Sequence, residues 1–145
     1  AFSPTFTSSM DAIITVDMFL ESAPVGGELS DTDFVTQTPS EGFLTTRINF
    51  AFDGTINVLD DLGSGAAFND TGATVIRDAW FELKMEFIFS DNQILYYIDD
   101  TLIFTGTVWA GGSIEQWIPL FDNFESSSVF DNFTYHIQDT KEIPI

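Results

Sequence analysis

The chain has 145 residues, of which 44% are hydrophobic, and its 23 acidic side chains against 4 basic ones give a formal net charge of −19. A surface this acidic excludes nucleic acid and anionic membranes as partners, because their recognition needs clustered Lys and Arg; no apolar run is long enough for membrane insertion. Cysteine is absent, which excludes thiol chemistry. The length and the sixteen Phe residues predict a single domain, residues 1–145, with an aromatic core.

The first third of the chain is predicted to be extended. Residues 1–9 carry Phe2 and Phe6 among small polar residues, and we expect an edge strand or an arm that packs on a neighbouring copy. Residues 12–20 alternate between apolar and other side chains, which predicts a long strand. Its inward set is Ala12, Ile14, Val16, Met18 and Leu20. A loop over residues 21–32 and a short strand over residues 33–38 follow.

A β-hairpin is predicted next. Asp53-Gly54 is the strongest hairpin signal in the chain. It joins a strand over residues 42–52 to a strand over residues 55–59. The inward set of the first strand is Thr46, Ile48, Phe50 and Phe52. The polar, Gly-rich residues 60–72 predict a loop anchored by Ala66, Ala67 and Phe68, before a short strand over residues 73–77.

Residues 79–104 form the clearest pattern, a meander of three antiparallel strands. Alternate positions carry large apolar side chains, a period of two that a helix would not place on one face. These positions are Phe81, Leu83, Met85, Phe87 and Phe89. Ser90-Asp91-Asn92 and Asp99-Asp100 supply the two turns.

The C-terminal part predicts two more strands. Residues 114–121 are interrupted by Pro119, which indicates an edge strand or a bulge. After a loop over residues 122–128, the strand over residues 129–137 should point Phe133, Tyr135 and Ile137 inward. About ten short strands separated by turns predict an all-β fold, an antiparallel two-sheet β-sandwich, and we expect a jelly roll.

Three segments resemble the concanavalin A-like lectin/glucanase superfamily, which includes laminin G-like jelly-roll modules. Phe52-Asp53-Gly54-Thr55-Ile56 is similar to the hairpin before the central strands of that family. Trp80-Phe81 with Tyr96-Tyr97-Ile98-Asp99 is similar to its central strand pair, although Asp100 stands where the family usually has Gly. Val129-Phe130-Asp131-Asn132-Phe133 is similar to its closing strand. The resemblance covers roughly residues 42–137 and implies a carbohydrate-binding jelly roll.

Carbohydrate binding needs exposed aromatic rings, on which the C–H faces of a sugar stack, and nearby polar groups for its hydroxyls. Trp109 lies in a predicted turn, and Trp117 faces away from Ile118 on its strand. The alternation requires that one of two adjacent tyrosines faces outward. We therefore take as candidate ligand-binding residues Trp109, Trp117, Tyr96, Tyr97, Glu115 and Gln116, with the alternative that both Trp rings cap the core.

Calcium is the expected cofactor. Ca²⁺ takes six to eight oxygen ligands, which acidic loops supply. Asp131 resembles the closing-strand Asp that ligates a structural calcium in many jelly-roll carbohydrate modules. Its predicted place on the inward side with Phe133 and Tyr135 demands a partner, either the metal or backbone N–H groups.

No catalytic residue is expected, so the chain is not predicted to be an enzyme. His136 is the one histidine and lies on the outward face of the last strand. Glu82 and Glu86 share a strand face, but Lys84 between them favours a charged solvent face over a glycosidase pair.

The predicted function is a non-catalytic, secreted or cell-surface module for carbohydrate binding or adhesion. The first alternative is a self-assembling subunit of a cell-surface layer or extracellular filament, a homo-oligomer or polymer built through the terminal arms that contain Phe2, Phe6, Ile143 and Ile145. The second is a polysaccharide hydrolase or lyase.

Overall fold

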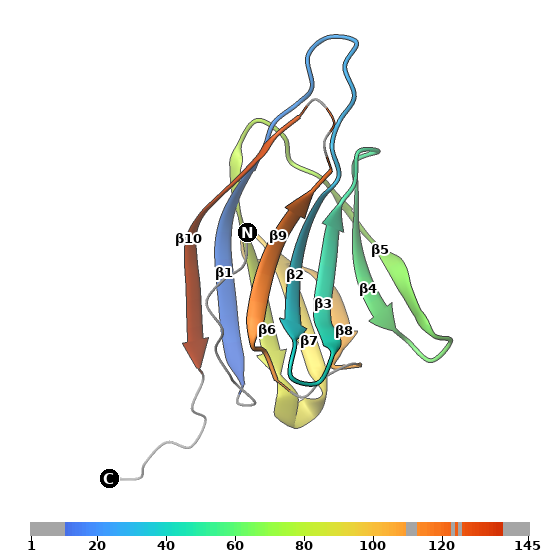
Figure 1. The fold of residues 1–145 in the computed structure, drawn as a ribbon, viewed down its shortest axis with the longest axis vertical. Helices are drawn as coiled ribbons and strands as arrows, with labels where there is room; N and C mark the ends of the chain where they lie inside the picture. Colours follow the sequence, from blue (N-terminus) through green and yellow to red (C-terminus); the bar gives the residue numbers. More distant parts are fainter. Residues whose placement is uncertain (1–10, 110–112, 123, 125, 138–145) are drawn as a thin grey trace.

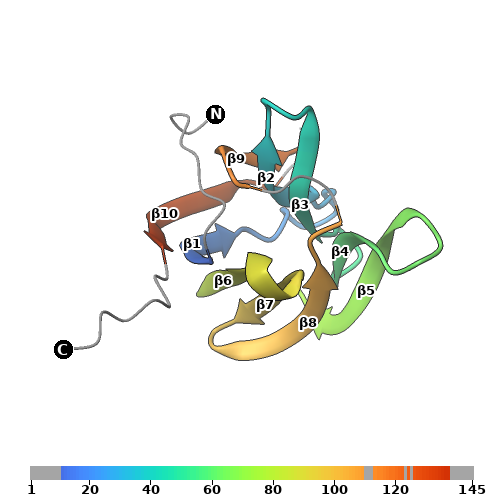
Figure 2. The same ribbon diagram turned by 90° about the horizontal axis from the view of Figure 1, so that it is seen from below.

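The computed structural model describes residues 11–109, 113–122, 124 and 126–137, which form two antiparallel β-sheets packed face to face (Figures 1 and 2). The strands are β1 (Ala12–Leu20), β2 (Thr32–Thr38), β3 (Phe43–Phe50), β4 (Thr55–Asp61), β5 (Ala66–Thr74), β6 (Trp80–Ile88), β7 (Gln93–Ile98), β8 (Thr101–Thr107), β9 (Gln116–Phe121) and β10 (Ser128–Ile137). A single turn of 3₁₀ helix, η1 (Phe89–Asp91), lies between β6 and β7. The predicted all-β sandwich is confirmed.

Each sheet has five strands. The first sheet has the order β10-β1-β6-β7-β8, and the second sheet has the order β5-β4-β3-β2-β9. The two layers are seen edge-on in Figure 2, where the β4–β5 hairpin extends beyond the rest of the second sheet. β9 is an edge strand, as Pro119 indicated. Proline has no backbone N–H, and it is tolerated in a strand that has no partner on one side.

The space between the sheets is filled by the alternating side chains. In β1 and β6 the predicted inward residues from Ala12 to Leu20 and from Phe81 to Phe87 are at most 3% exposed. Phe50 of the second sheet packs against Phe81 of the first, with ring centroids 5.4 Å apart. Each fully buried Phe, Leu or Ile side chain contributes about 1.5–3 kcal/mol through the hydrophobic effect. This core is what holds the two sheets together.

The central meander is confirmed, with β6, β7 and β8 side by side. Asp99 and Asp100 both have positive φ, 47° and 64°, as a two-residue type I′ hairpin turn requires. Asp100 therefore adopts the backbone conformation that glycine usually supplies. Asn92, with φ of 57°, ends η1 in the same left-handed region. β6 ends at Ile88, so Phe89, which was predicted as part of this strand, begins η1 instead.

Two predictions for the second sheet were wrong. Residues 60–72 are not a loop, because β4 continues to Asp61 and β5 runs from Ala66 to Thr74. β5 is a mostly exposed edge strand, so its sequence lacks the alternation of apolar residues that marks a half-buried strand. Phe52 is not inward either: β3 ends at Phe50, and the side chain of Phe52 in the following turn is 62% exposed.

The inward placement of Asp131 was also wrong, because β10 contains a β-bulge. The register with β1 shifts between the pairs Thr15–Thr134 and Asp17–Asp131, and Asn132 has a φ of 51°. An extra residue in one strand reverses the alternation of side chains beyond it. Phe130 and Phe133 both pack against the core, and Asp131 is exposed.

Several predictions concern residues outside the described part of the chain. The terminal arms, residues 1–9 and 138–145, and the side chain of Ile137 belong to this group. That residues 1–145 form a single domain stays a prediction. Within the described residues, no helix has the length and apolar character needed to span a membrane.

Candidate functional site

A row of side chains in register crosses the outer face of the second sheet. Backbone pairing aligns Leu120 of β9 with Asp33 of β2, Asp33 with Asn49 of β3, Asn49 with Asn57 of β4, and Asn57 with Asp70 of β5. Each of the three central residues alternates with a buried apolar neighbour, so the pleat directs the polar side chains away from the core. The register thus brings together four polar residues from four strands.

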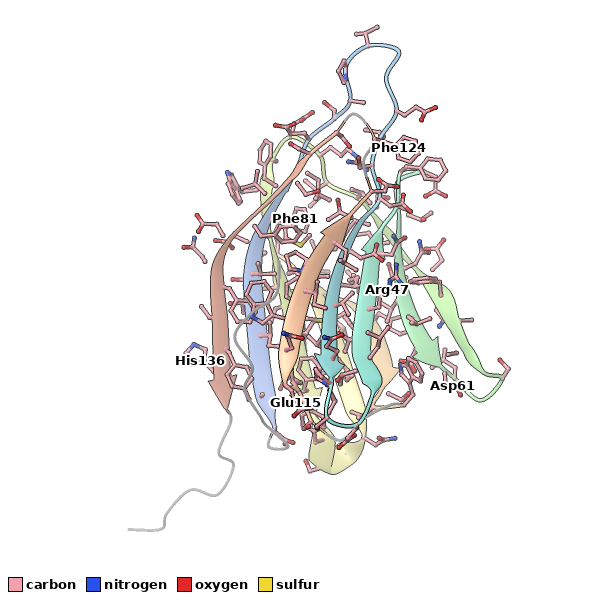
Figure 3. All side chains as sticks on the ribbon, viewed as in Figure 1. Arg47, Asp61, Phe81, Glu115, Phe124 and His136 are labelled. Atoms are coloured by element: carbon pink, nitrogen blue, oxygen red, sulfur yellow. The ribbon has the colours of Figure 1, made fainter. Side chains whose placement is uncertain are left out.

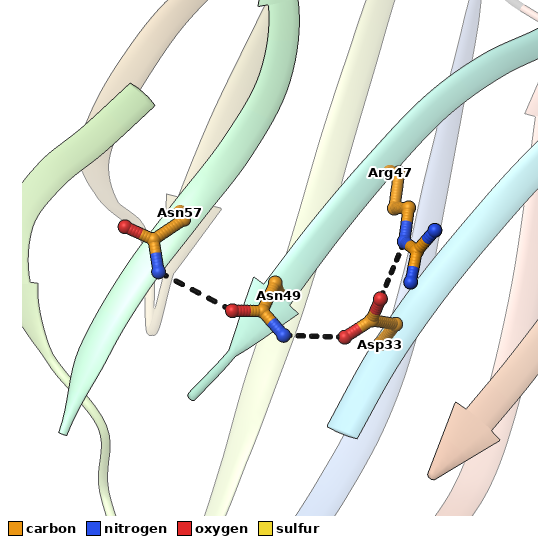
Figure 4. Close-up of polar contacts among 4 residues, drawn as sticks. All are labelled: Asp33, Arg47, Asn49 and Asn57. Carbon is orange, nitrogen blue, oxygen red and sulfur yellow. Dashed lines mark hydrogen bonds and ion pairs between the residues drawn. The ribbon is translucent and has the colours of Figure 1, made fainter. Parts of the chain in front are cut away.

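Hydrogen bonds connect the middle of this row (Figure 4). Asn57 Nδ2 donates to Asn49 Oδ1 at 3.2 Å, and Asn49 Nδ2 donates to Asp33 Oδ1 at 2.6 Å. The other oxygen of Asp33 forms an ion pair with Arg47 Nε at 2.5 Å. Both oxygens of Asp33 thus accept a hydrogen bond, one from Arg47 and one from Asn49, and its side chain is only 7% exposed. Its role in this arrangement is to hold its two neighbours in place.

Arg47 lies between this carboxylate and an exposed aromatic ring. Its guanidinium carbon is 5.5 Å from the ring centroid of Phe68 on β5, a cation–π distance. The Arg47 side chain is 38% exposed, and Phe68 is 47% exposed. Among the described residues, neither the terminal nitrogens of Arg47 nor Asn57 Oδ1 has a hydrogen bond. The site therefore offers donors, an acceptor and an apolar ring side by side.

These residues line a cavity of about 710 Å³, which we call the sheet cavity. Its size falls within the usual range for small-molecule sites, roughly 300–1,000 Å³. Its lining is Asp31, Asp33, Arg47, Asn49, Asp53, Thr55, Asn57, Phe68, Asp70, Leu120 and Asp122. Figure 3 shows Arg47 on the face of β3, between the loops above and the β4–β5 hairpin that carries Asp61.

The carboxylates around the sheet cavity are fixed by the backbone. One oxygen of Asp53 accepts from Thr55 N and Oγ1, and one of Asp70 accepts from Gly72 N. One oxygen of Asp31 accepts from Phe52 N, and one of Asp122 accepts from Asp31 N. The second oxygen of each has no hydrogen bond within the described part of the chain. Four acceptors are therefore held rigidly at the cavity wall.

The hydrogen bonds to Asp53 favour its ionised form. The hydrogen bonds from the hydroxyl and then the backbone N–H of Thr55 lower the pKa of Asp53 from its ordinary value of 3.8, because they stabilise the charged form. The cavity wall therefore presents negative charge and hydrogen-bond acceptors at neutral pH.

The two candidate tyrosines lie on opposite faces of β7, far from the sheet cavity on the other sheet. Tyr96 points into the core and is 1% exposed. Burial, with a smaller effect of the Asp60 charge, raises the pKa of the Tyr96 hydroxyl. Tyr97 is the outward one, and the ammonium of Lys84 lies 4.6 Å from its ring centroid.

Of the candidates near β9, Trp117 follows the alternative that was left open, a place against the core. Trp117 faces the core and stacks on Phe133, with ring centroids 4.2 Å apart. Trp109 is half-buried after β8. Glu115 is 8% exposed and accepts hydrogen bonds from Ser40 N at 2.8 Å and Ser40 Oγ at 2.5 Å, so it fixes the β2–β3 turn.

Gln116 is the one candidate on the face of the sheet cavity. Its side-chain oxygen accepts from Gln37 Nε2 at 2.5 Å. The pairing places Gln37–Gln116 four residues along β2 from Asp33–Leu120, which lines the cavity. The structure thus brings none of the candidate aromatic rings together with Gln116.

The candidate metal ligand Asp131 lies on the outer face of the first sheet. Its carboxylate accepts from Asn132 N at 2.8 Å, and Asn132 Nδ2 donates to Asp17 at 2.8 Å. Among the described residues, no group of three or more His, Cys, Asp or Glu side chains is placed to hold a metal ion. Calcium at Asp131 stays a prediction.

Five residues of this site were not predicted as ligand-binding residues from the sequence: Asp33, Arg47, Asn49, Asn57 and Phe68. A signal was present for two of them: Arg47 is one of 4 bases in the chain, and it shares a strand face with Asn49 beside buried Ile48. The alignment of these residues with Asp33 and Asn57 depends on strand register, and Phe68 lay in a segment taken for a loop.

Known proteins are similar to this chain in structure and not in sequence. No known sequence family matches the chain, and no characterised protein is detectably similar to it in sequence. A carbohydrate-binding module, CBM66 from Bacillus subtilis, is similar with a TM-score of 0.65 and 13% identity over 90% of this chain and 76% of that one. Sheep galectin-11, solved in complex with glycerol, is similar with a TM-score of 0.66 and 14% identity over 94% and 96%.

A sialidase is similar with a TM-score of 0.71 and 10% identity over 94% of this chain, which spans only 14% of the sialidase. Identities this low establish the fold and nothing finer. The fold is a concanavalin A-like jelly-roll β-sandwich, and the resemblance found in the sequence is confirmed at the level of the fold.

Proposed function

We propose that this protein is a non-catalytic carbohydrate-binding module whose binding site is the sheet cavity. The observation that carries the proposal is the row of Asp33, Asn49 and Asn57 beside the Arg47–Phe68 pair. A sugar ring has an apolar C–H face and a rim of hydroxyls. An exposed aromatic ring next to fixed polar groups complements both.

The polar groups suit an uncharged saccharide. Hydroxyls donate to the unoccupied oxygens of Asp31, Asp53, Asp70 and Asp122, and hydrogen bonds to charged acceptors are the strong ones. The same carboxylates repel the acid groups of uronic and sialic acids, and Arg47 is already paired with Asp33. Neutral glycans are therefore the proposed ligands, and binding to them at a secreted or cell-surface location is the proposed role.

The alternative functions receive less support. Glu82 and Glu86 lie on the outer face of the first sheet, on the opposite side of the sandwich from the sheet cavity, and Lys84 beside them pairs with Asp100 at 2.8 Å. A hydrolase or lyase centred on them would not use the cavity. Self-assembly through the terminal arms concerns residues outside the described part of the chain.

A glycan array followed by calorimetry tests the proposal. Wild-type protein should bind at least one neutral glycan, and Arg47→Ala should weaken that binding at least about tenfold, since it removes the cavity's cation and the partner of Phe68. Lys84→Ala is the matched control, because it removes one base from the opposite sheet and should bind like wild type. Absence of binding to any neutral glycan, or equal weakening in both variants, would falsify the proposal.

A further inference from the structure

A second cavity adjoins the sheet cavity at the loop end of the sandwich. It has a volume of about 500 Å³ and is lined by Gly27, Glu28, Leu29, Asp31, Phe52, Asp122 and Phe124. We call it the loop cavity. Asp31 and Asp122 line both cavities, so the two are neighbours that share this pair of residues as a common wall. Figure 3 shows Phe124 beyond Arg47 toward the loops.

Two aromatic rings at the loop cavity are exposed to solvent. Phe52 is 62% exposed and Phe124 is 54% exposed, whereas core Phe residues such as Phe50 and Phe87 are fully buried. Exposed Phe rings that border a cavity are typical of binding surfaces. Neither ring therefore contributes to the core as the inward Phe residues do.

The backbone that carries Phe52 is held in a fixed conformation. Phe52 N donates to Asp31 Oδ1 at 2.7 Å, and Gly54 N closes the turn by donating to Ala51 O at 3.0 Å. Gly54 has a φ of 92°, which a residue with a Cβ rarely adopts. The ring of Phe52 is thus presented by a rigid turn.

The two chain segments on either side of Phe124 are also tied to the β1–β2 loop. Asp122 and Asp31 exchange two hydrogen bonds, Asp122 N to Asp31 O at 3.1 Å and Asp31 N to Asp122 Oδ1 at 2.8 Å. Ser30 donates two more to Ser126, from its backbone N–H to Oγ at 2.7 Å and from its hydroxyl to the backbone oxygen at 2.8 Å. These bonds fix the wall between the cavities before any ligand arrives, which reduces the entropic cost of binding.

We infer that the loop cavity is a second saccharide subsite, occupied by the continuation of the chain bound in the sheet cavity. This inference rests on the proposed function. Asp31 and Asp122 line both cavities, and their remaining oxygens accept hydroxyl hydrogen bonds, while Phe52 and Phe124 stack on the next sugar rings. The ligand is accordingly an extended neutral oligosaccharide, and affinity rises with its length.

Calorimetry with oligosaccharides of two lengths tests the inference. The probes are the two-unit and six-unit members of the neutral cello-, malto-, xylo- and laminari-oligosaccharides. In the series that binds, the six-unit member should bind wild type at least about tenfold more tightly than the two-unit member. Phe52→Ala/Phe124→Ala should remove that difference and leave the two-unit affinity unchanged. Arg47→Ala should weaken both.

Each failure has its own signature. Equal affinities for both lengths, or a double variant that keeps the length dependence, overturn the second subsite and leave the proposed function standing. No binding of any series overturns the second subsite, and the proposed function falls with it when the glycan array also shows no neutral ligand. Leu102→Ala/Val129→Ala is the control, because these side chains are 49% and 44% exposed and lie outside both cavities. Sedimentation of wild type as a dimer that Phe52→Ala/Phe124→Ala dissociates would instead assign the rings to a contact between copies.

Discussion

Asp60 accepts two hydrogen bonds from Thr107, at 2.7 Å from the backbone N–H and at 2.6 Å from the hydroxyl. Asp60 lies on β4 of the second sheet and is 1% exposed, and Thr107 ends β8 of the first sheet. The pair therefore fastens the two layers of the sandwich across the core. Gly106 leaves space for it, because a Cβ there would collide with Asp60 Oδ2.

Thr107→Val should destabilise the fold by about 1–3 kcal/mol, because it leaves one oxygen of a buried carboxylate without its donor. Thr105→Val, at an exposed position of the same strand, is the control and should change stability little. Urea unfolding at pH 7 measures both free energies. Equal values for the two variants would show that the hydroxyl bond contributes nothing across the sheets.

Side-chain alternation was enough to predict most of the fold. β1 and β6 each carry at least four apolar residues at every second position, so their inward faces followed from the period of two. β5 was not predicted, because an edge strand with two exposed faces carries no such pattern. The bulge at Asn132 could not be predicted either, since it depends on the pairing of β10 with β1. That one extra residue moved Asp131 from the core to solvent.

Most residues of the candidate site could not be predicted from the sequence, for a related reason. Trp117 and Tyr96 were proposed as sugar platforms because of their residue type, but alternation gives two faces without saying which one is inside. Packing on Phe34 and Phe133 settles this for Trp117. The residues of the sheet cavity come from five strands and the loops beside them, and the strand residues meet only through register, which no local pattern encodes.

Asp33 should contribute to glycan affinity by holding the Arg47 side chain in position. Asp33→Asn removes the charge that holds the guanidinium, so neutral-glycan affinity should fall about tenfold although both oxygens of Asp33 already bond to Arg47 and Asn49. This bond should protect the Arg47 Nε–H group from solvent exchange in the wild type, and its NMR signal should broaden in the variant. Loss of affinity with an unchanged Arg47 signal would contradict a positioning role.

The stability of the fold should fall at acid pH as Asp78 becomes protonated. Hydrogen bonds from the hydroxyl and backbone N–H of Ser22 lower the pKa of Asp78 below its ordinary value of 3.8. Because the folded pKa is the lower one, ionised Asp78 stabilises the fold above the unfolded pKa, and this contribution is lost as pH falls through the folded pKa.

Asp78→Asn should therefore lower the melting temperature at pH 7 and should have a shrinking effect as the pH falls below about 4. Asn tolerates the positive φ of 58° at this position, so the backbone is retained. Thermal melts of both proteins between pH 2 and 7 measure the difference. A difference that stays constant over this range would exclude a contribution from the ionised carboxylate.

Calcium binding at Asp131 predicts a melting temperature that rises with added Ca²⁺ and falls with EDTA. Asp131→Asn should abolish this response, because it removes the charged ligand. Asp91→Asn is the control, since Asp91 is an exposed acid in η1 on another part of the surface. Wild-type melts that are identical in Ca²⁺ and in EDTA would remove Asp131 as a metal ligand.

The carboxylates of the sheet cavity should select against acidic glycans. Asp31, Asp33, Asp53, Asp70 and Asp122 face one guanidinium, that of Arg47, in a protein with a net charge of −19. Polygalacturonate and alginate oligosaccharides should therefore not bind at 50 mM NaCl. Neutral-glycan affinity should change little up to 500 mM NaCl, because screening by salt acts on charge repulsion and not on stacking or hydroxyl bonds.

Asp53→Asn/Asp70→Asn should relax this selection and allow weak binding of polygalacturonate, since it removes two charges and keeps an acceptor oxygen at each position. Asp91→Asn/Asp100→Asn removes the same charge outside the cavity and should still reject the polyanion. Calorimetry of both double variants against neutral and acidic oligosaccharides separates the local charge from the net charge. Tight polygalacturonate binding by wild type would show that Arg47, not the surrounding carboxylates, governs which glycans enter the cavity.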